Sequence, residues 1–221
     1  MSLAPPEAIG PLRRERLRTA RLYLVCEALP RGREPEPLLE AALAGGVDIV
    51  QLREKELDLD AIIRSSRTFR RLCDTYSALF ILNDDPALAR RCDADGVHLG
   101  QDDMPVAEAR ELLGPEAIIG LSTHSEEQID EASSAPVDYI SVGPIWETPT
   151  KEGRPGVGVG LVEYARANSA HPFFAIGGID ADNAPEVCAA GATRLGAVRA
   201  IRDAERPQEA AEALRKVPPG G

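Results

Sequence analysis

The chain has 221 residues, of which 43% are hydrophobic and 28% are charged. This composition is typical of a globular protein with one substantial core, and it excludes a disordered chain. The net charge of −11 excludes a typical nucleic-acid-binding surface, because such surfaces cluster Lys and Arg. Phosphorylated small molecules are still possible ligands, since a few local cations suffice to bind them.

The sequence also carries expectations about compartment. No apolar run approaches the roughly 20 residues that a membrane helix needs, and the first ten residues lack the apolar core of a signal peptide. The four cysteines are widely separated and form no CxxC pair. We therefore expect a cytoplasmic protein that does not contact membranes and keeps its cysteines as small buried thiols.

Short apolar runs alternate with amphipathic segments along the chain. The segment 5–20 is expected to form an extra leading helix. Strands are then predicted at 21–26, 48–54, 79–83, 96–99, 118–123, 139–143, 173–178 and 194–200. Helices are predicted at 36–46, 59–76, 86–92, 105–113, 125–133, 161–168, 183–192 and 206–217.

This order predicts a (β/α)8 TIM barrel with an extra N-terminal helix. The strands are short and rich in β-branched residues, as in a parallel sheet covered on both faces. Residues 1–20 would form an N-terminal extension or helix that could cap the N-terminal end of the barrel, and residues 21–217 a single barrel domain. A doubly wound open sheet is the alternative. In such barrels, ligands bind at the C-terminal ends of the strands.

The second predicted strand ends in the sequence QLREK. Side chains alternate across a strand, so Gln51, Arg53 and Lys55 share one face, while Leu52 and Glu54 share the other. Two cations on one face would be costly to bury without an anionic partner. The face therefore predicts an anion site, with structural ion pairs inside the barrel as the alternative.

Carboxylates follow the third and fourth predicted strands. Asn83, Asp84 and Asp85 end the third strand, and Asp102 and Asp103 lie just beyond the fourth. Mg²⁺ prefers one or two carboxylates together with water and phosphate oxygens. The two pairs together therefore favour a metal site. The alternative is that each pair caps the helix after it.

Later strand ends carry weaker signals. Ser122 and His124 share a face at the end of the fifth predicted strand, but no G-x-S-x-G elbow surrounds them, so a hydroxyl that binds phosphate is favoured over a nucleophile. The glycine pair at 177–178 would let backbone N–H groups approach a phosphate, together with 198–199 at the end of the eighth strand.

The segment 143–160 reads GPIWETPTKEGRPGVGVG and is built largely from Gly and Pro. It follows the sixth predicted strand, which places Thr148, Thr150 and Lys151 over the mouth of the barrel. We interpret it as a lid that closes over an anionic ligand and is mobile at 149–158 without one, rather than as a linker. Glu147 is expected to point to solvent.

Six stretches in this order resemble the thiamine-phosphate synthase family: QLREK, the Asn-Asp after the third strand, GVHLGQDDM, LSTH, VGPIWETPTK and AIGGI. The resemblance covers about 22–214. It implies a (β/α)8 barrel, a need for Mg²⁺ and a homodimer. It also implies transfer of a pyrimidinylmethyl group from 4-amino-2-methyl-5-(diphosphooxymethyl)pyrimidine to a thiazole ethyl phosphate, often carboxylated, which gives thiamine phosphate and pyrophosphate.

The resemblance also implies the site residues, motif by motif. They are Gln51, Arg53, Lys55 and Asn83 for the pyrimidine diphosphate, Asp84 and Asp103 for Mg²⁺, Ser122 and Lys151 for the diphosphate, and Thr148, Thr150, Gly178, Val198 and Arg199 for the thiazole phosphate. Lys55, Ser122 and Lys151 would have catalytic roles. Many members have Ser where this chain has Arg199; a backbone phosphate contact would tolerate the arginine, whereas a hydroxyl contact would be lost.

Three alternatives share parts of this pattern. A thiazole tautomerase has the same barrel but handles no diphosphate, so it has no need of Asp84, Asp103 or the full QLREK. A non-catalytic thiamine-phosphate-binding protein would be expected to lack the metal ligands or Lys151. A sugar-phosphate epimerase or aldolase would share the late phosphate site but would not explain TPTK. The sequence therefore favours the synthase.

Overall fold

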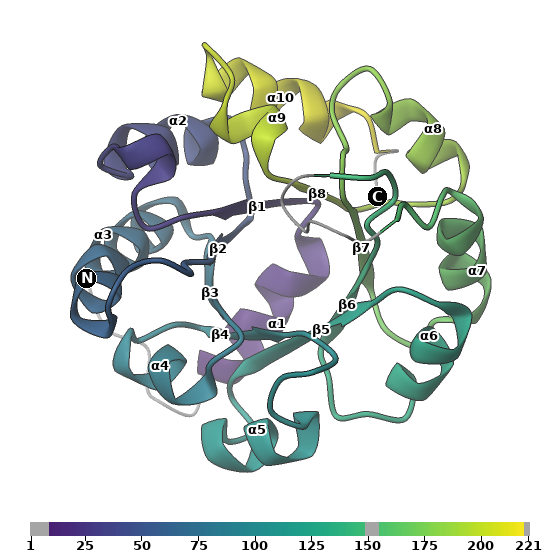
Figure 1. Cartoon of the computed structure of the whole chain (residues 1–221), viewed down its shortest axis with the longest axis horizontal. Helices are drawn as coiled ribbons and strands as arrows, with labels where there is room; N and C mark the ends of the chain where they lie inside the picture. The colour runs from purple at the N-terminus through teal and green to yellow at the C-terminus, as the bar shows by residue number, and fades with distance from the viewer. Residues whose placement is uncertain (1–8, 149–154, 219–221) are drawn as a thin grey trace.

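The structure of the protein, a computed structural model, describes residues 9–148 and 155–218. Its parallel strands form a closed barrel in chain order, in which each strand pairs with the next and β8 pairs with β1 (Figure 1). This confirms the predicted barrel and excludes the open sheet. The strands are β1 (Leu22–Cys26), β2 (Ile49–Leu52), β3 (Leu79–Asn83), β4 (Gly96–Leu99), β5 (Ile118–Thr123), β6 (Tyr139–Val142), β7 (Phe173–Ile176) and β8 (Leu195–Ala197).

Helices surround the barrel, except for α1, which lies across one end of it (Figure 1). The extra N-terminal helix that the sequence predicts is therefore present. The helices are α1 (Ile9–Thr19), the 3-10 turn η2 (Pro30–Gly32), α2 (Glu36–Ala44), α3 (Leu59–Tyr76), α4 (Pro86–Arg91), α5 (Val106–Leu113), α6 (Glu126–Ala132), α7 (Gly160–Asn168), α8 (Ala184–Ala189), α9 (Arg199–Arg202) and α10 (Pro207–Lys216).

Strand β8 differs from its prediction. The apolar run at 194–200 predicts one strand, but β8 ends at Ala197 and the short helix α9 starts at Arg199. Val198 has φ −122° and ψ −89°, which leaves the extended region and ends the strand. Arg199 therefore belongs to a helix at the mouth of the barrel rather than to a strand end.

The alternation of side chains along the strands creates two cores. One fills the layer between the strands and the surrounding helices and contains most of the buried Leu, Val and Ala residues. The other fills the barrel interior in its N-terminal half. Its members are Leu17, Ala20, Tyr23, Val25, Ile49, Leu79, Ile81, Ile118, Tyr139 and Phe174.

Helix α1 closes the N-terminal end of the barrel. Its Leu17, together with Ala20 just beyond it, packs onto the interior core, and both residues are buried. Arg13 of the same helix donates from Nε to Oδ1 of Asp95 at 2.8 Å. The predicted capping role of the leading helix is thus confirmed, and the lower half of the barrel is sealed by apolar contact and by charge pairing.

An aspartate precedes each of the strands β2, β4 and β6. Each carboxylate accepts a backbone N–H from the neighbouring odd strand at 2.8–3.0 Å and also pairs with an arginine. Asp95 is buried, so its charge requires these partners. The sets are Asp48 with Leu22 and Arg215, Asp95 with Phe80 and Arg13, and Asp138 with Ile119 and Arg110.

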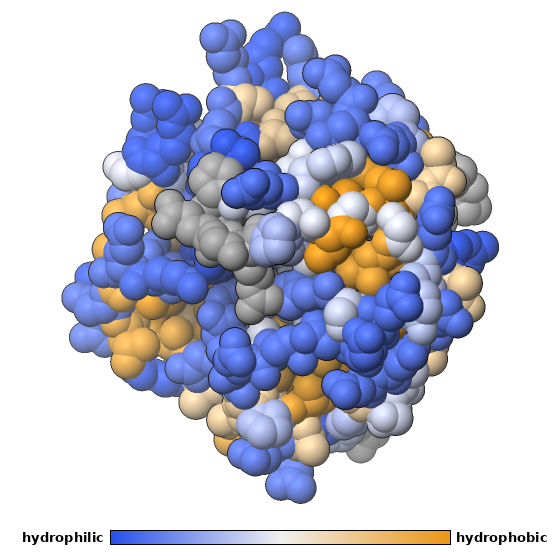
Figure 2. Space-filling model, turned by 45° about the vertical axis from the view of Figure 1, so that its right-hand side comes forward, coloured by the Kyte–Doolittle hydropathy of each residue, from blue (hydrophilic) through white to orange (hydrophobic). Residues whose placement is uncertain are grey.

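One face of the molecule is mainly polar on its surface. Figure 2 shows hydrophilic residues over most of one face, with hydrophobic residues gathered in smaller areas between them. Among the described residues, no helix is both long and apolar enough to cross a membrane.

Candidate functional site

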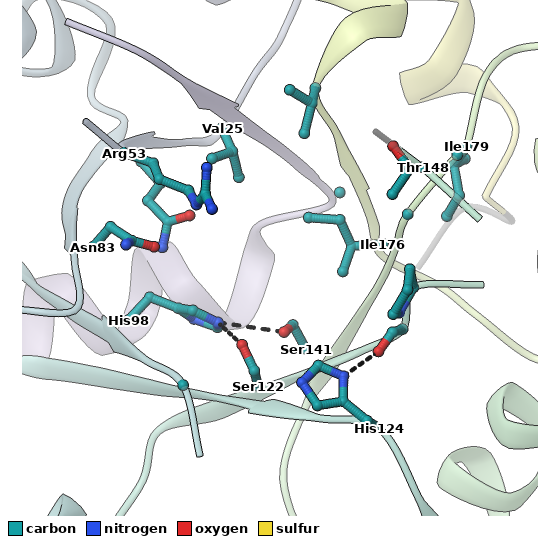
Figure 3. Close-up of a pocket in the computed structure, with 18 of the residues that line it drawn as sticks. Val25, Arg53, Asn83, His98, Ser122, His124, Ser141, Thr148, Ile176 and Ile179 are labelled. Atoms are coloured by element: carbon teal, nitrogen blue, oxygen red, sulfur yellow. Dashed lines mark hydrogen bonds between the residues drawn. The ribbon is translucent and has the colours of Figure 1, made fainter. Parts of the chain in front are cut away.

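A cavity of about 590 Å³ opens at the C-terminal ends of the strands. Its floor is formed by the last inward-facing side chains of strands β1 to β7, at the upper edge of the interior core, to which Val25 also belongs. Figure 3 shows Arg53, Asn83 and His98 on one side of it and Thr148, Ile176 and Ile179 on the other. The floor residues are Val25, Gln51, Asn83, His98, Ser122, Ser141 and Ile176.

The end of β2 lies in this cavity with the predicted orientation. Gln51, Arg53 and Lys55 line the cavity. Glu54, on the other face, accepts the N–H groups of Ala28 at 3.2 Å and Lys55 at 2.8 Å. Gln51 is 4% exposed, and its Nε2 has no hydrogen-bond partner among the described residues. A buried donor without a partner indicates that a ligand acceptor belongs beside it.

The carboxylates after β3 and β4 divide into two roles. Asp85 caps α4, because its side chain accepts the N–H of Leu88 at 2.9 Å. Asp84 instead lines the cavity, as does Asp103. The capping alternative is therefore correct for Asp85 only; α5 begins after Pro105, without a side-chain cap.

Asp84 and Asp103 both line the cavity, and the Asp103 carboxyl acts on the titration of Asp84. Burial, and secondarily the neighbouring Asp103, raise the pKa of Asp84 to about 6, although Lys55 and Arg53 oppose the shift. Asp103 also accepts the N–H of Gly100 at 2.6 Å. A buried carboxyl beside a second carboxylate is suited to binding a cation.

The pair fits a hard divalent cation better than a softer metal. In the described ranges, no group of three His, Cys, Asp or Glu side chains converges on one point. A zinc site normally needs at least three such ligands, whereas Mg²⁺ uses one or two carboxylates and completes its shell with water and phosphate oxygens. Asp84 and Asp103 are the residues of the cavity that could supply such carboxylates.

Ser122 has a different partner from the one that its sequence neighbourhood suggests. Its Oγ lies 3.0 Å from Nε2 of His98, and Oγ of Ser141 lies 3.3 Å from the same nitrogen (Figure 3). His98 and Ser141 were not predicted as site residues. Strand register brings the three side chains together. His98 pairs with Gly120, two residues before Ser122 on the same face, and Ser122 pairs with Ser141.

His124 stabilises the loop after β6. Its Nδ1 contacts the carbonyl oxygen of Gly143, whose peptide bond to Pro144 is cis (Figure 3). Its backbone N–H donates to Oε1 of Gln128 at 2.7 Å, at the start of α6. His124 also lines the cavity, so the same residue holds the loop and forms part of the wall of the site.

The described start of the predicted lid is attached to the last residue of β7 and to the residue after it. The N–H of Ile145 donates to the carbonyl of Ile176 at 2.9 Å, and the N–H of Trp146 donates to that of Gly177 at 3.1 Å. Thr148 is buried and lines the cavity, while Glu147 is exposed, as expected. Thr150 and Lys151 lie outside the described residues, and so does most of the segment predicted to be mobile.

The backbone after β7 requires glycine at both positions of the predicted glycine pair. Gly177 and Gly178 have φ of 107° and 68°, which side chains rarely adopt. A Cβ at Gly177 would also lie 2.4 Å from Cα of Pro144. Both glycines line the cavity together with Val198 and Arg199, so the structure brings together the residues predicted to approach a phosphate after β7 and β8.

A closed (β/α)8 barrel with this polar cavity at its C-terminal end belongs to the class of barrel proteins that bind small molecules at their strand ends. The polar lining separates into an amide and cation side at β2, a carboxylate pair at β3 and β4, and hydroxyl groups at β5 and β6. The chain belongs to the thiamine monophosphate synthase family, whose model matches residues 22–201.

Relatives support this membership over most of the chain. The thiamine-phosphate synthase of Nostoc sp. is 47% identical over 90% of this chain, but that match spans only 56% of the relative. The thiamine-phosphate synthase of Acidothermus cellulolyticus is 48% identical over 88% of this chain and 93% of its own length. This chain therefore spans about half the length of some curated relatives and nearly all of others.

A solved structure agrees with the fold and the family. The thiamine phosphate pyrophosphorylase of Pyrococcus furiosus superposes with a TM-score of 0.82 at 33% identity, covering 92% of this chain and 96% of its own. The predicted resemblance to the thiamine-phosphate synthase family is thus confirmed.

Proposed function

We propose that this protein is a thiamine-phosphate synthase. It would join 4-amino-2-methyl-5-(diphosphooxymethyl)pyrimidine to a thiazole ethyl phosphate and release thiamine phosphate and pyrophosphate, with CO₂ when the thiazole is carboxylated. The observation that carries the proposal is the juxtaposition, in one cavity, of the β2 cations with the carboxylate pair Asp84 and Asp103. A tautomerase acting on the thiazole phosphate alone would need neither group.

In this reaction the bond between the pyrimidine methylene carbon and the diphosphate oxygen breaks, and the thiazole nitrogen bonds to the same carbon. The electron pair of the broken bond leaves with pyrophosphate, so negative charge accumulates on the leaving group. Arg53 and Lys55 supply fixed positive charge where that group would lie. Gln51 and Asn83 would bind the pyrimidine, since the unpartnered Gln51 Nε2 needs an acceptor.

Asp84 and Asp103 would hold Mg²⁺ in this proposal. When bound, Mg²⁺ neutralises part of the diphosphate charge as a Lewis acid. The charge of the ion would offset the repulsion between the two ionised carboxylates, which, after burial, contributes to the raised pKa of Asp84. The other polar side chains that line the cavity would bind and orient the diphosphate.

The opposite side of the cavity would take the other substrate. Thr148, Gly178 and the backbone at 198–199 line it, and the resemblance adds Thr150. Ser122 and Lys151 would contact the diphosphate and, with Lys55, carry the catalytic roles. No protein nucleophile is required, because the thiazole nitrogen is the attacking atom.

The test is an assay with both substrates and Mg²⁺ that measures thiamine phosphate and pyrophosphate separately. Omission of either substrate or of Mg²⁺ should abolish both products. A tautomerase would instead convert the carboxylated thiazole phosphate with neither Mg²⁺ nor the pyrimidine diphosphate present. A folded protein that binds thiamine phosphate but forms no product under any condition would favour the non-catalytic role.

We also propose that the protein acts as a homodimer in the cytoplasm on small phosphorylated substrates, without nucleic acid or membrane partners. The resemblance supports the dimer, and the net charge of −11 supports the exclusion of nucleic acid. Light scattering on the purified chain should give about twice the monomer mass of 23.7 kDa. A monomer at micromolar concentration would contradict the dimer without affecting the proposed reaction.

A further inference from the structure

A continuous line of hydrogen bonds runs from the barrel interior to the cavity. The hydroxyl groups of Tyr23 and Tyr139 lie 2.9 Å apart, and the hydroxyl of Tyr139 lies 3.0 Å from Nδ1 of His98. The other imidazole nitrogen, Nε2, contacts Ser122 at 3.0 Å and Ser141 at 3.3 Å. His98 thus joins two tyrosines below the cavity floor to two hydroxyl groups on it.

The side chains of this hydrogen-bonded line are buried, and a glycine beside them provides the space that they occupy. Tyr23 and Tyr139 are buried, as are His98 and both serines. Gly120 makes the space: a Cβ there would lie 2.1 Å from Cζ of Tyr139 and 2.6 Å from Nδ1 of His98. Neither tyrosine lines the cavity, so any influence they have on a ligand passes through the imidazole.

Counting donors along the line fixes its direction. If Nδ1 of His98 carried the proton, it would donate to Tyr139, Tyr139 would donate to Tyr23, and the Tyr23 hydroxyl hydrogen would need a further acceptor. Among the described residues, Tyr139 is the hydrogen-bond partner that the structure gives to Tyr23. A buried hydroxyl left without an acceptor is costly, so this direction is disfavoured.

The opposite direction satisfies every donor. Tyr23 donates to Tyr139, Tyr139 donates to Nδ1, and the proton of the neutral imidazole lies on Nε2, from which it donates to Ser122. Burial raises the pKa of both tyrosines, which keeps them protonated as donors. The hydroxyl hydrogens of Ser122 and Ser141 are then directed away from His98 and toward the cavity.

We infer that His98 is a positioning residue, held by Tyr139 as the Nε2–H tautomer so that Ser122 and Ser141 both present hydroxyl hydrogens to an anionic ligand group. That the anion is the diphosphate rests on the proposed function. In the reverse tautomer, Nε2 would accept a hydrogen bond from one serine hydroxyl and so remove one donor from the cavity. The inference adds Ser141 to the anion site. It also gives Tyr139, which does not line the cavity, an effect on ligand binding.

A purely structural role for the network predicts something different. In that case, loss of either tyrosine hydroxyl would lower stability by a similar amount and leave ligand affinity unchanged. Tyr139→Phe and Tyr23→Phe are therefore matched variants, since each deletes one buried hydroxyl oxygen. Of these two tyrosines, Tyr139 is the one whose hydroxyl contacts His98.

The first experiment reads the tautomer directly in the ligand-free protein. The chain has three histidines, so long-range ¹⁵N–¹H spectra of histidine-labelled protein are simple, and His98→Gln identifies the His98 signals by their loss. At about pH 8 we expect the Nε2–H pattern in the wild type and in Tyr23→Phe, and a mixture of tautomers in Tyr139→Phe. An Nδ1–H imidazole or an imidazolium in the wild type would overturn the inference.

The second experiment measures the affinity for inorganic pyrophosphate with saturating Mg²⁺ by calorimetry. Loss of one hydrogen bond to a charged ligand corresponds to roughly tenfold weaker binding, which we expect for Ser141→Ala and in smaller degree for Tyr139→Phe. Tyr23→Phe should stay within about twofold. His98→Gln retains an N–H near the position of Nε2, so it should bind more tightly than His98→Ala.

These outcomes separate the inference from the proposed reaction. Equal pyrophosphate affinities for Tyr139→Phe and wild type, or no pyrophosphate binding by the wild type, would overturn the role of the network. Failure to form thiamine phosphate, with the tautomer and the affinities as expected, would overturn the proposed reaction and leave the positioning role intact. Circular dichroism of each variant confirms that it is folded.

Discussion

The two ends of this barrel use carboxylates in opposite ways. At the N-terminal end, Asp95 accepts a backbone N–H and pairs with Arg13 and Arg70 at 2.8 and 3.0 Å. At the C-terminal end, Asp84 and Asp103 face each other, and their proximity contributes to a raised pKa at Asp84. Asp95 is fully compensated by the fold, whereas Asp84 and Asp103 have no salt bridge within the part of the chain that the structure describes.

The contrast extends to the neutral side chains of the interior. Ile49 and Ile81 fill the lower layer by apolar contact, while Gln51 and Asn83, one pleat above them, face the cavity. The lower half therefore stabilises the barrel and the upper half leaves polar groups for a ligand. This division predicts that substitutions at the two ends separate stability from activity.

The largest expected effect is on stability at the closed end. Asp95→Ala leaves Arg13, Arg70 and the N–H of Phe80 without their buried partner, and should lower the free energy of unfolding by about 3 kcal/mol or more. Asp74→Ala is the matched control, because exposed Asp74 pairs with the same Arg70 and should cost less than about 1 kcal/mol. Urea unfolding measures both, and similar losses would contradict the division.

At the open end, Asp84→Asn should act on turnover instead. Asparagine tolerates the φ of 65° at this position, so the fold is retained. Thiamine phosphate formation should fall by at least about a hundredfold, because the Mg²⁺ ligand is lost. Asp85→Asn is the control, since it keeps a cap on α4 and should turn over like the wild type. An active Asp84→Asn enzyme would remove Asp84 from the metal site.

The loop after β6 offers a smaller effect. Lys151→Ala should reduce turnover at least about tenfold, because a cation that stabilises the leaving diphosphate is removed. Glu147→Ala, in the same loop and exposed, is the matched control and should leave turnover near the wild-type value. Continuous detection of released pyrophosphate measures both, and wild-type kinetics for Lys151→Ala would refute its assigned role.

The smallest effect is a pH-dependent shift in melting temperature. The raised pKa of Asp84 means that its protonated form is favoured by the fold, so the contribution of Asp84 to stability is present below the ordinary pKa and is lost as pH rises through about 6. Mg²⁺ would relieve this loss. We expect Mg²⁺ to raise the melting temperature by a few degrees at about pH 8 and hardly at all near pH 5. A pH-independent shift would place the ion elsewhere.

Local patterns allowed the fold and much of the cavity lining to be predicted. Each strand and helix has its own periodicity, and the alternation along QLREK correctly separates Gln51, Arg53 and Lys55 from Glu54. The predicted end of β8 was wrong, because an apolar run does not reveal that the backbone turns at Val198.

Relations between strands could not be read from sequence alone. The pairing of Ser122 with His98, rather than with its sequence neighbour His124, depends on the register of β4 and β5. The separate roles of Asp84 and Asp85 depend on the left-handed backbone at Asp84, which turns its side chain into the cavity. Both are set by tertiary structure.

The most direct test of the whole account is the product stoichiometry of the wild-type protein. With both substrates and Mg²⁺, we expect one pyrophosphate for each thiamine phosphate formed, and neither product when Mg²⁺ is removed by a chelator. A folded, Mg²⁺-loaded protein that releases pyrophosphate without thiamine phosphate, or forms neither, would contradict the assignment of the open end of the barrel to this reaction.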